Sequence, residues 1–204
     1  MSVRNNRGKI FRLLIVNWTL GVLLSGCIPV RSIYYEPQAG LGKIISEGSC
    51  SMSIERELSL SLSEDMDLDL QIQLDHSKEE PTRLYVRYSI SSGHIIRFMD
   101  DSIDVQVGAD MEPYSYKLTR LKVAAEAGEP YQTISVTDAI ESKEWVTRDG
   151  TDGRTYFFFS LPLQIRPEQL SVLLPALMED GKLITIPKVM FTKKKRVHVT
   201  GLCQ

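Results

Sequence analysis

Hydrophobic and polar residues alternate along much of this chain. Between residues 52 and 74 most apolar residues occupy even-numbered positions, and the odd-numbered positions are mainly Ser, Asp, Glu and Gln. A period of two is typical of a strand with one buried and one exposed face. A single strand of this length would measure about 75 Å at about 3.3 Å per residue. We therefore predict two strands, separated at Ser63-Glu64-Asp65.

Further strands are predicted where the alternation returns, at residues 84–90, 103–107, 114–118, 134–136, 183–186 and 189–191. Residues 156–161 are apolar on both faces, as expected for a central or covered strand, and the turn formers of residues 149–153 predict a hairpin with them as its second arm. Only residues 138–145 have a pattern compatible with one or two helical turns.

These elements predict an all-β domain with little helix. About ten short strands, separated by turn-forming residues roughly every 8 to 12 positions, are typical of an antiparallel sandwich or barrel. We favour an antiparallel β-sandwich, Ig-like or transthyretin-like, and keep a small β-barrel as the alternative.

The N-terminal segment has a different character. Its first twelve residues contain four basic residues and no acidic one, and an apolar run from Leu13 to Leu24 follows. This run is shorter than the roughly 20 residues that span a bilayer, and the order of a basic and then an apolar region is that of a secretory signal. The run ends in Leu24-Ser25-Gly26-Cys27, which resembles the lipobox of bacterial lipoproteins. The alternatives are an ordinary cleavable signal, in which Cys27 is incidental, and a non-cleaved anchor.

The resemblance implies a signal peptide over residues 1–26 and a mature chain that begins at lipid-modified Cys27. Residues 28–42 contain Pro and Gly without a period, so we expect residues 27–43 to be the lipidated cysteine and its tether, and residues 44–204 to form a single β-sandwich domain. The residue after the cysteine is Ile28, not the aspartate that retains lipoproteins in the inner membrane. The expected location is therefore the outer membrane, with the domain facing the periplasm.

The charge of the mature chain narrows the class of partner. Without residues 1–26 the chain has 178 residues, 20 Lys and Arg and 26 Asp and Glu. A length of this kind suits one domain with a real core. A net negative charge does not favour a non-specific affinity for nucleic acid or for an anionic membrane, and we expect no nucleic-acid partner.

Two cysteines remain once Cys27 is lipidated. Cys50 lies near the start of the predicted domain and Cys203 is the penultimate residue. In an oxidising compartment this arrangement predicts one disulfide that joins the first strand to the last, and two separate buried thiols are the alternative.

Metal and catalytic motifs are weak. Asp65, Asp67 and Asp69 resemble the start of a calcium loop, but Leu70 and His76 occupy positions where that loop needs Gly and Glu. We interpret the three carboxylates as the exposed face of a strand, and Asp149 and Asp152 as turn residues. The histidines, His76, His94 and His198, are far apart, and no nucleophile motif accompanies them. We expect no cofactor, no metal and no enzymatic activity.

The basic run Lys193-Lys194-Lys195-Arg196 is the candidate interaction patch. It could contact phosphate-bearing lipid, lipopolysaccharide or an acidic partner. The simpler interpretation is a solvated turn or a protected edge, because lysines discourage pairing between sheet edges. For the aromatic residues 156–159 we likewise favour a place in the core, and keep a ligand groove as the alternative.

These features favour an outer-membrane-anchored periplasmic lipoprotein that acts as a non-catalytic binding or scaffolding module for an envelope component, such as an accessory subunit of a secretion or envelope assembly, and we expect an envelope protein as its partner. The alternatives are an immunity or inhibitor lipoprotein and, less favoured, a small-ligand carrier or hydrolase. A fold alone does not choose among them.

Overall fold

The computed structural model describes residues 28–47, 55–74, 82–108, 112–124, 132–141 and 154–200. These residues form sixteen strands in three sheets, and every strand pair in them is antiparallel. None of the described residues is helical, and no helix there has the length and apolar character needed to cross a membrane.

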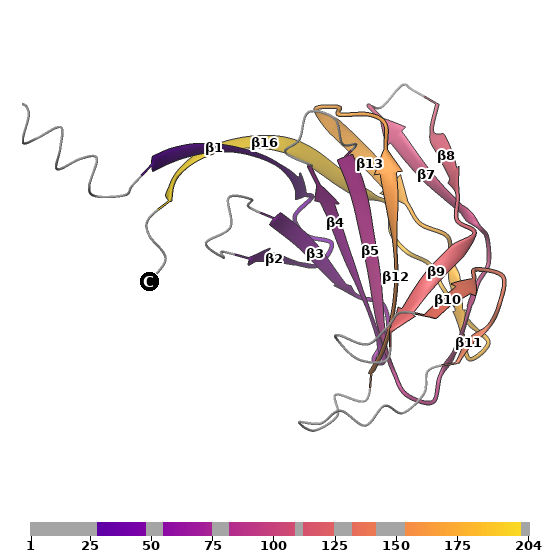
Figure 1. Ribbon diagram of the computed structural model, residues 1–204. Helices are drawn as coiled ribbons and strands as arrows, with labels where there is room; N and C mark the ends of the chain where they lie inside the picture. Colours follow the sequence, from indigo (N-terminus) through magenta and orange to yellow (C-terminus); the bar gives the residue numbers. More distant parts are fainter. Residues whose placement is uncertain are drawn as a thin grey trace, which may run out of the picture.

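The two larger sheets form the layers of the sandwich, and the smallest lies at one end of it (Figure 1). In spatial order, the five-stranded sheet consists of β1 (Ile28–Pro37), β16 (Val189–Thr200), β13 (Gln169–Leu173), β7 (Ser102–Val107) and β8 (Tyr114–Lys117). The seven-stranded sheet consists of β10 (Gln132–Ser135), β9 (Arg120–Ala124), β12 (Arg154–Leu163), β5 (Thr82–Ser91), β4 (Met66–Gln73), β3 (Glu55–Ser61) and β2 (Lys43–Glu47). The four-stranded sheet consists of β11 (Ile140–Glu141), β6 (Ile95–Phe98), β14 (Leu177–Glu179) and β15 (Lys182–Ile184).

The predicted all-β sandwich is confirmed. The long alternating segment divides where expected, since β3 ends at Ser61 and β4 begins at Met66. Strand β12 is central, with β5 on one side and β9 on the other. The barrel alternative is wrong for the described strands, because they form three separate sheets. The number of strands exceeds the predicted ten because several short strands, among them β6, β11 and β14, have too few residues to show a period.

The core lies between the inner faces of the two larger sheets. Strands β4 and β5 supply their even-numbered residues, as the alternation predicted, and β12 supplies Phe157 and Phe159. Tyr88 stacks on Phe157 with ring centroids 4.8 Å apart, and Phe98 meets both rings edge-on. Edge-to-face and stacked aromatic pairs are the preferred geometries, so this cluster links β5, β6 and β12.

Two sequence-based expectations about β1 and β16 need correction. Residues Ile28–Pro37, expected to be an irregular tether, form β1 and pair with β16 along their whole length, from Ile28 opposite Thr200 to Pro37 opposite Phe191. The final short strand does not stop before the basic run but continues to Thr200 as β16. Both errors have one cause: the pairing is long-range, and the outer part of the β1–β16 ribbon projects from the body, so neither of its faces requires an apolar period (Figure 1). The helical pattern over residues 138–145 is not realised over Asp138–Glu141, because Asp138 lies at a bend and Ile140–Glu141 form strand β11. Its remaining residues lie outside the described parts.

Candidate functional site

The outer face of the seven-stranded sheet, which points away from the core, carries an unusual set of side chains. Asp69 of β4 lies opposite Arg87 of β5, which in turn lies opposite Phe158 of β12. Because side chains alternate along a strand, these three residues point to the same face, together with Tyr85 and Tyr156. A fully solvated sheet face needs only polar side chains, so aromatic rings here call for an explanation.

The polar centre of this face is the pair of Asp69 and Arg87. The Arg87 guanidinium donates from Nε and Nη2 to Asp69 Oδ2, at 3.0 and 2.8 Å, and Nη2 also reaches Glu57 Oε1 at 3.4 Å. Burial lowers the pKa of Arg87, but the hydrogen bond and charge of Asp69 outweigh it, so the pKa is raised and the side chain stays cationic. The Asp69 side chain is only 11% exposed, whereas that of Arg87 is 51% exposed. The carboxylate is therefore a fixed support that holds the guanidinium at the surface.

Beside this pair the sheet has a shallow depression of about 250 Å³. The depression is lined by the polar side chains of Glu57, Gln71 and Arg87 and by the aromatic rings of Tyr85 and Phe158. Such a surface can accept an apolar group against the rings while its rim supplies hydrogen bonds, as in binding sites in general. We call this set of residues, with Asp69, the outer-face site.

The sequence patterns pointed to the acidic and the aromatic residues of this site separately, and we interpreted them as an exposed strand face and as core. The aromatic segment 156–159 proves to be divided: Phe157 and Phe159 are buried in the core, and Tyr156 and Phe158 are half-buried on the outer face. Asp69 points away from the core, as predicted for the acidic face of this strand. It is not exposed, however, because its neighbours on that face bury it. The missing information was the strand order, which brings β4, β5 and β12 together.

The three alternating carboxylates also have separate partners. Asp67 forms an ion pair with Arg154, at 2.8 Å, Asp69 binds Arg87, and Asp65 Oδ2 lies 3.5 Å from His94 Nε2. Within the described parts of the chain, His, Cys, Asp and Glu side chains do not gather in a group suited to a metal ion.

His94 joins three turns at one end of the sandwich. Its Nδ1 lies 2.7 Å from Asp180 Oδ2 in the β14–β15 turn, and its Nε2 approaches Asp65 in the β3–β4 turn. The second Asp180 oxygen accepts the Ile95 N–H at 2.9 Å. This hydrogen bond and the one to His94 lower the pKa of Asp180. Ser63 in the same cluster donates to Glu179, at 3.2 Å. These contacts hold the turns together, so we assign His94 a structural role. His76 lies outside the described residues, and the backbone of His198 pairs with Val30 in the ribbon.

The basic run does not act as one patch. Lys193 is 18% exposed and its Nζ binds Glu168 Oε1 at 2.9 Å, an interaction that lowers the pKa of Glu168. Lys194, Lys195 and Arg196 are exposed on the outer part of β16. There β16 pairs with β1 on one side, while its pairing with β13 ends at Thr192. The interpretation of a protected edge therefore fits this part of the strand better than a turn does.

Cys27, Cys50 and Cys203 lie outside the described residues, as do Asp149 and Asp152. The lipidation at Cys27 and the disulfide between Cys50 and Cys203 stay predictions.

Comparison of the chain with protein-family models gave no match, and a search of curated proteins also gave none.

Proposed function

We propose that the chain is an outer-membrane lipoprotein whose β-sandwich faces the periplasm and binds an envelope protein without catalysis. Two features support the anchoring. Leu24-Ser25-Gly26-Cys27 resembles a lipobox, and the residue after it, Ile28, is the first of β1. An anchor at Cys27 would continue directly into a hydrogen-bonded ribbon, so the domain would be held at a defined distance from the bilayer.

The outer-face site carries the binding part of the proposal. Tyr, Phe and Arg are enriched at protein interfaces, and well-supported anchors contribute most of the binding energy. Here Tyr85 and Phe158 form an aromatic surface on rigid central strands, and Asp69 fixes the orientation of Arg87. Less ordering is then needed on binding, which improves affinity. A protein partner with an apolar side chain and hydrogen-bonding groups fits this surface.

Site-specific cross-linking tests the binding face. A photoreactive amino acid is placed at Tyr85 in the full-length, lipidated protein, and cross-linked products are identified by mass spectrometry. The matched control is Tyr114, an aromatic residue on β8 that is 45% exposed on the other sheet. We expect one reproducible partner from Tyr85, lost on Phe158→Ala and absent from Tyr114. Equal products from both positions would refute the assignment of this face.

Metabolic labelling tests the anchor. Radioactive palmitate should label the protein, and Cys27→Ala should abolish the label and release the protein from membranes. Persistent labelling of the variant would show that the lipid is not at Cys27.

A further inference from the structure

The outer part of the β1–β16 ribbon has a chemistry that differs from the rest of the surface. We call the exposed side chains there, namely Ile33, Lys194, Lys195, Arg196 and Val197, the basic ribbon. Val197 is 63% exposed and Ile33 is 37% exposed, so aliphatic side chains stand among the cations. The ribbon extends beyond the body of the sandwich (Figure 1).

Both faces of the ribbon are basic. Alternation places Lys194 and Arg196 on one face, and Lys195 with Val197 on the other. Ile33 lies directly opposite Lys195 and therefore shares its face. A flat acidic protein surface could meet only one of these faces. Ser32, opposite Arg196, is 2% exposed, so the β1 side of that face is covered, but the exposed cations of β16 lie on both sides of the strand beyond its pairing with β13. A layer of anionic headgroups could reach the cations on both sides of β16, and the two aliphatic side chains would suit the boundary between headgroups and acyl chains.

The position of the ribbon brings it near the expected lipid. Ile28 pairs with Thr200 at the ribbon end, and Cys27 directly precedes Ile28. Arg196 lies opposite Ser32, four residues along β1, which corresponds to about 13 Å at about 3.3 Å per residue. The polar region of a leaflet adds about 5–8 Å to the hydrocarbon core. A tilt of the ribbon therefore brings the cations into the headgroups.

We propose that the basic ribbon binds the anionic phospholipid headgroups of the leaflet in which the chain is anchored. This inference rests on the proposed lipid anchor at Cys27. Electrostatic attraction and acylation are the two signals that together give stable membrane attachment. The contact would fix the tilt of the ribbon and hence the direction in which the outer-face site points.

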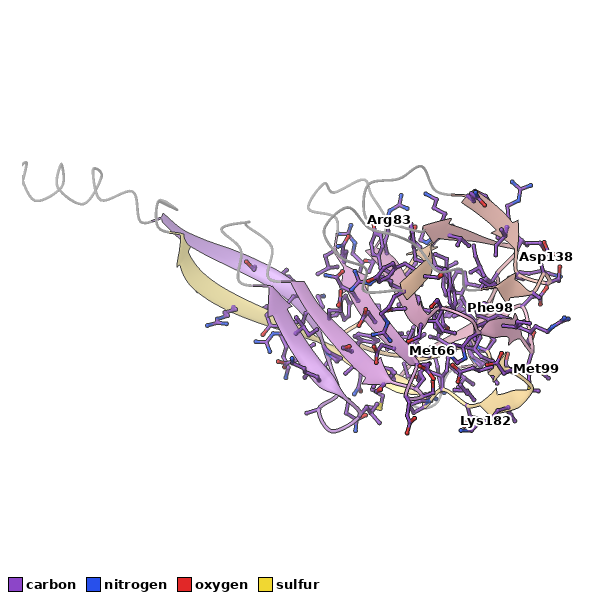
Figure 2. All side chains as sticks on the ribbon, turned by 90° about the horizontal axis from the view of Figure 1, so that it is seen from below. Met66, Arg83, Phe98, Met99, Asp138 and Lys182 are labelled. Carbon is purple, nitrogen blue, oxygen red and sulfur yellow. The ribbon has the colours of Figure 1, made fainter. Side chains whose placement is uncertain are left out.

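Lysine footprinting of the full-length, lipidated protein tests the contact. The protein is inserted into vesicles of phosphatidylcholine alone or of phosphatidylcholine with phosphatidylglycerol, and acylation of each lysine is followed by mass spectrometry. We expect Lys194 and Lys195 to react about fivefold more slowly in the anionic vesicles, which corresponds to about 1 kcal/mol per cation near an anionic surface. Salt at about 1 M should remove the difference, because the Debye length falls to about 3 Å. Lys182, which lies far from the ribbon (Figure 2), should react equally in both.

Matched double variants separate a local effect from a general change of charge. Lys194→Gln with Arg196→Gln should remove most of the protection at Lys195. The control, Arg97→Gln with Lys182→Gln, removes two exposed cations from β6 and β15 and should leave the protection unchanged.

Flotation of the same samples at high salt reports the anchor separately. Protein that floats but shows no slower labelling in anionic vesicles overturns the ribbon contact and leaves the anchor standing. Protein that does not float overturns both. Protection that appears in native envelopes but not in pure lipid vesicles also overturns the phospholipid contact, and assigns the ribbon to another anionic component of the envelope.

Discussion

The asymmetric burial of Asp69 and Arg87 leads to a prediction about stability. Arg87→Met keeps much of the aliphatic contact but leaves a carboxylate that is 11% exposed without its two N–H donors. Removing one partner of a fully buried pair costs about 3–5 kcal/mol, whereas exposed pairs contribute about 0–1 kcal/mol. Since the Arg87 side chain is 51% exposed, solvent screens the pair from one side. We therefore expect Arg87→Met to lower the free energy of unfolding by about 2 kcal/mol.

Substitution of the acidic partner should lower the free energy of unfolding by less. Asp69→Ala leaves a guanidinium that solvent and Glu57 still reach, so we expect a loss of about 1 kcal/mol. Urea unfolding of both variants and of the double variant measures the losses and the coupling between the two residues. Arg83→Met is the matched control, since Arg83 lies on the same strand and face, and it should change stability by less than about 0.5 kcal/mol. The reasoning is refuted if Asp69→Ala costs more than Arg87→Met, or if Arg83→Met costs as much.

Three further substitutions test the packing and the buried hydroxyl. Gly42→Ala should lower stability by about 1–3 kcal/mol, because the new Cβ would clash with the Ser59 carbonyl oxygen; an unchanged urea midpoint would contradict this. Phe157→Ala should cost about 3–5 kcal/mol, since the ring is fully buried against Tyr88, with Phe157→Leu as the milder control in the same assay. Burial raises the pKa of Tyr35 to about 12, so the protein should lose stability between pH 10 and pH 12 as the unfolded chain ionises first. Tyr35→Phe should lose less over this range, and an identical pH profile would exclude the contribution.

The proposed anchor and the two proposed surfaces make a consistent arrangement. The ribbon is at one side of the molecule, and the outer-face site is on central strands of the large sheet (Figure 1). The site is therefore separate in the fold from the chain end expected to carry lipid. A partner could reach Tyr85 and Phe158 while the basic ribbon stays at the membrane.

Much of the fold followed from local patterns. The alternation over β3, β4 and β5 predicted which apolar residues face the core, because a sheet with one covered face imposes a period of two. The doubly apolar segment predicted the central position of β12. The lipobox-like residues are also a local signal, so the proposed anchoring depends on the sequence alone.

Other features depend on contacts between distant parts of the chain. β1 forms because β16 lies beside it, although 151 positions separate Pro37 from Val189, and no period within residues 28–37 announces this pairing. The run of cations, expected at a turn or a protected edge, lies at an edge of β16, where Lys193 is ion-paired with Glu168 and the other three cations are exposed.

The outer-face site shows most directly which features depend on local sequence and which depend on tertiary contacts. The sequence determined that β4 and β5 each have a polar face and that β12 is aromatic. Only the strand order and register placed Asp69, Arg87 and Phe158 in one row across the sheet. Residues on one strand specify their own faces because the backbone period is local, whereas neighbours across a sheet are chosen by the packing of the whole core.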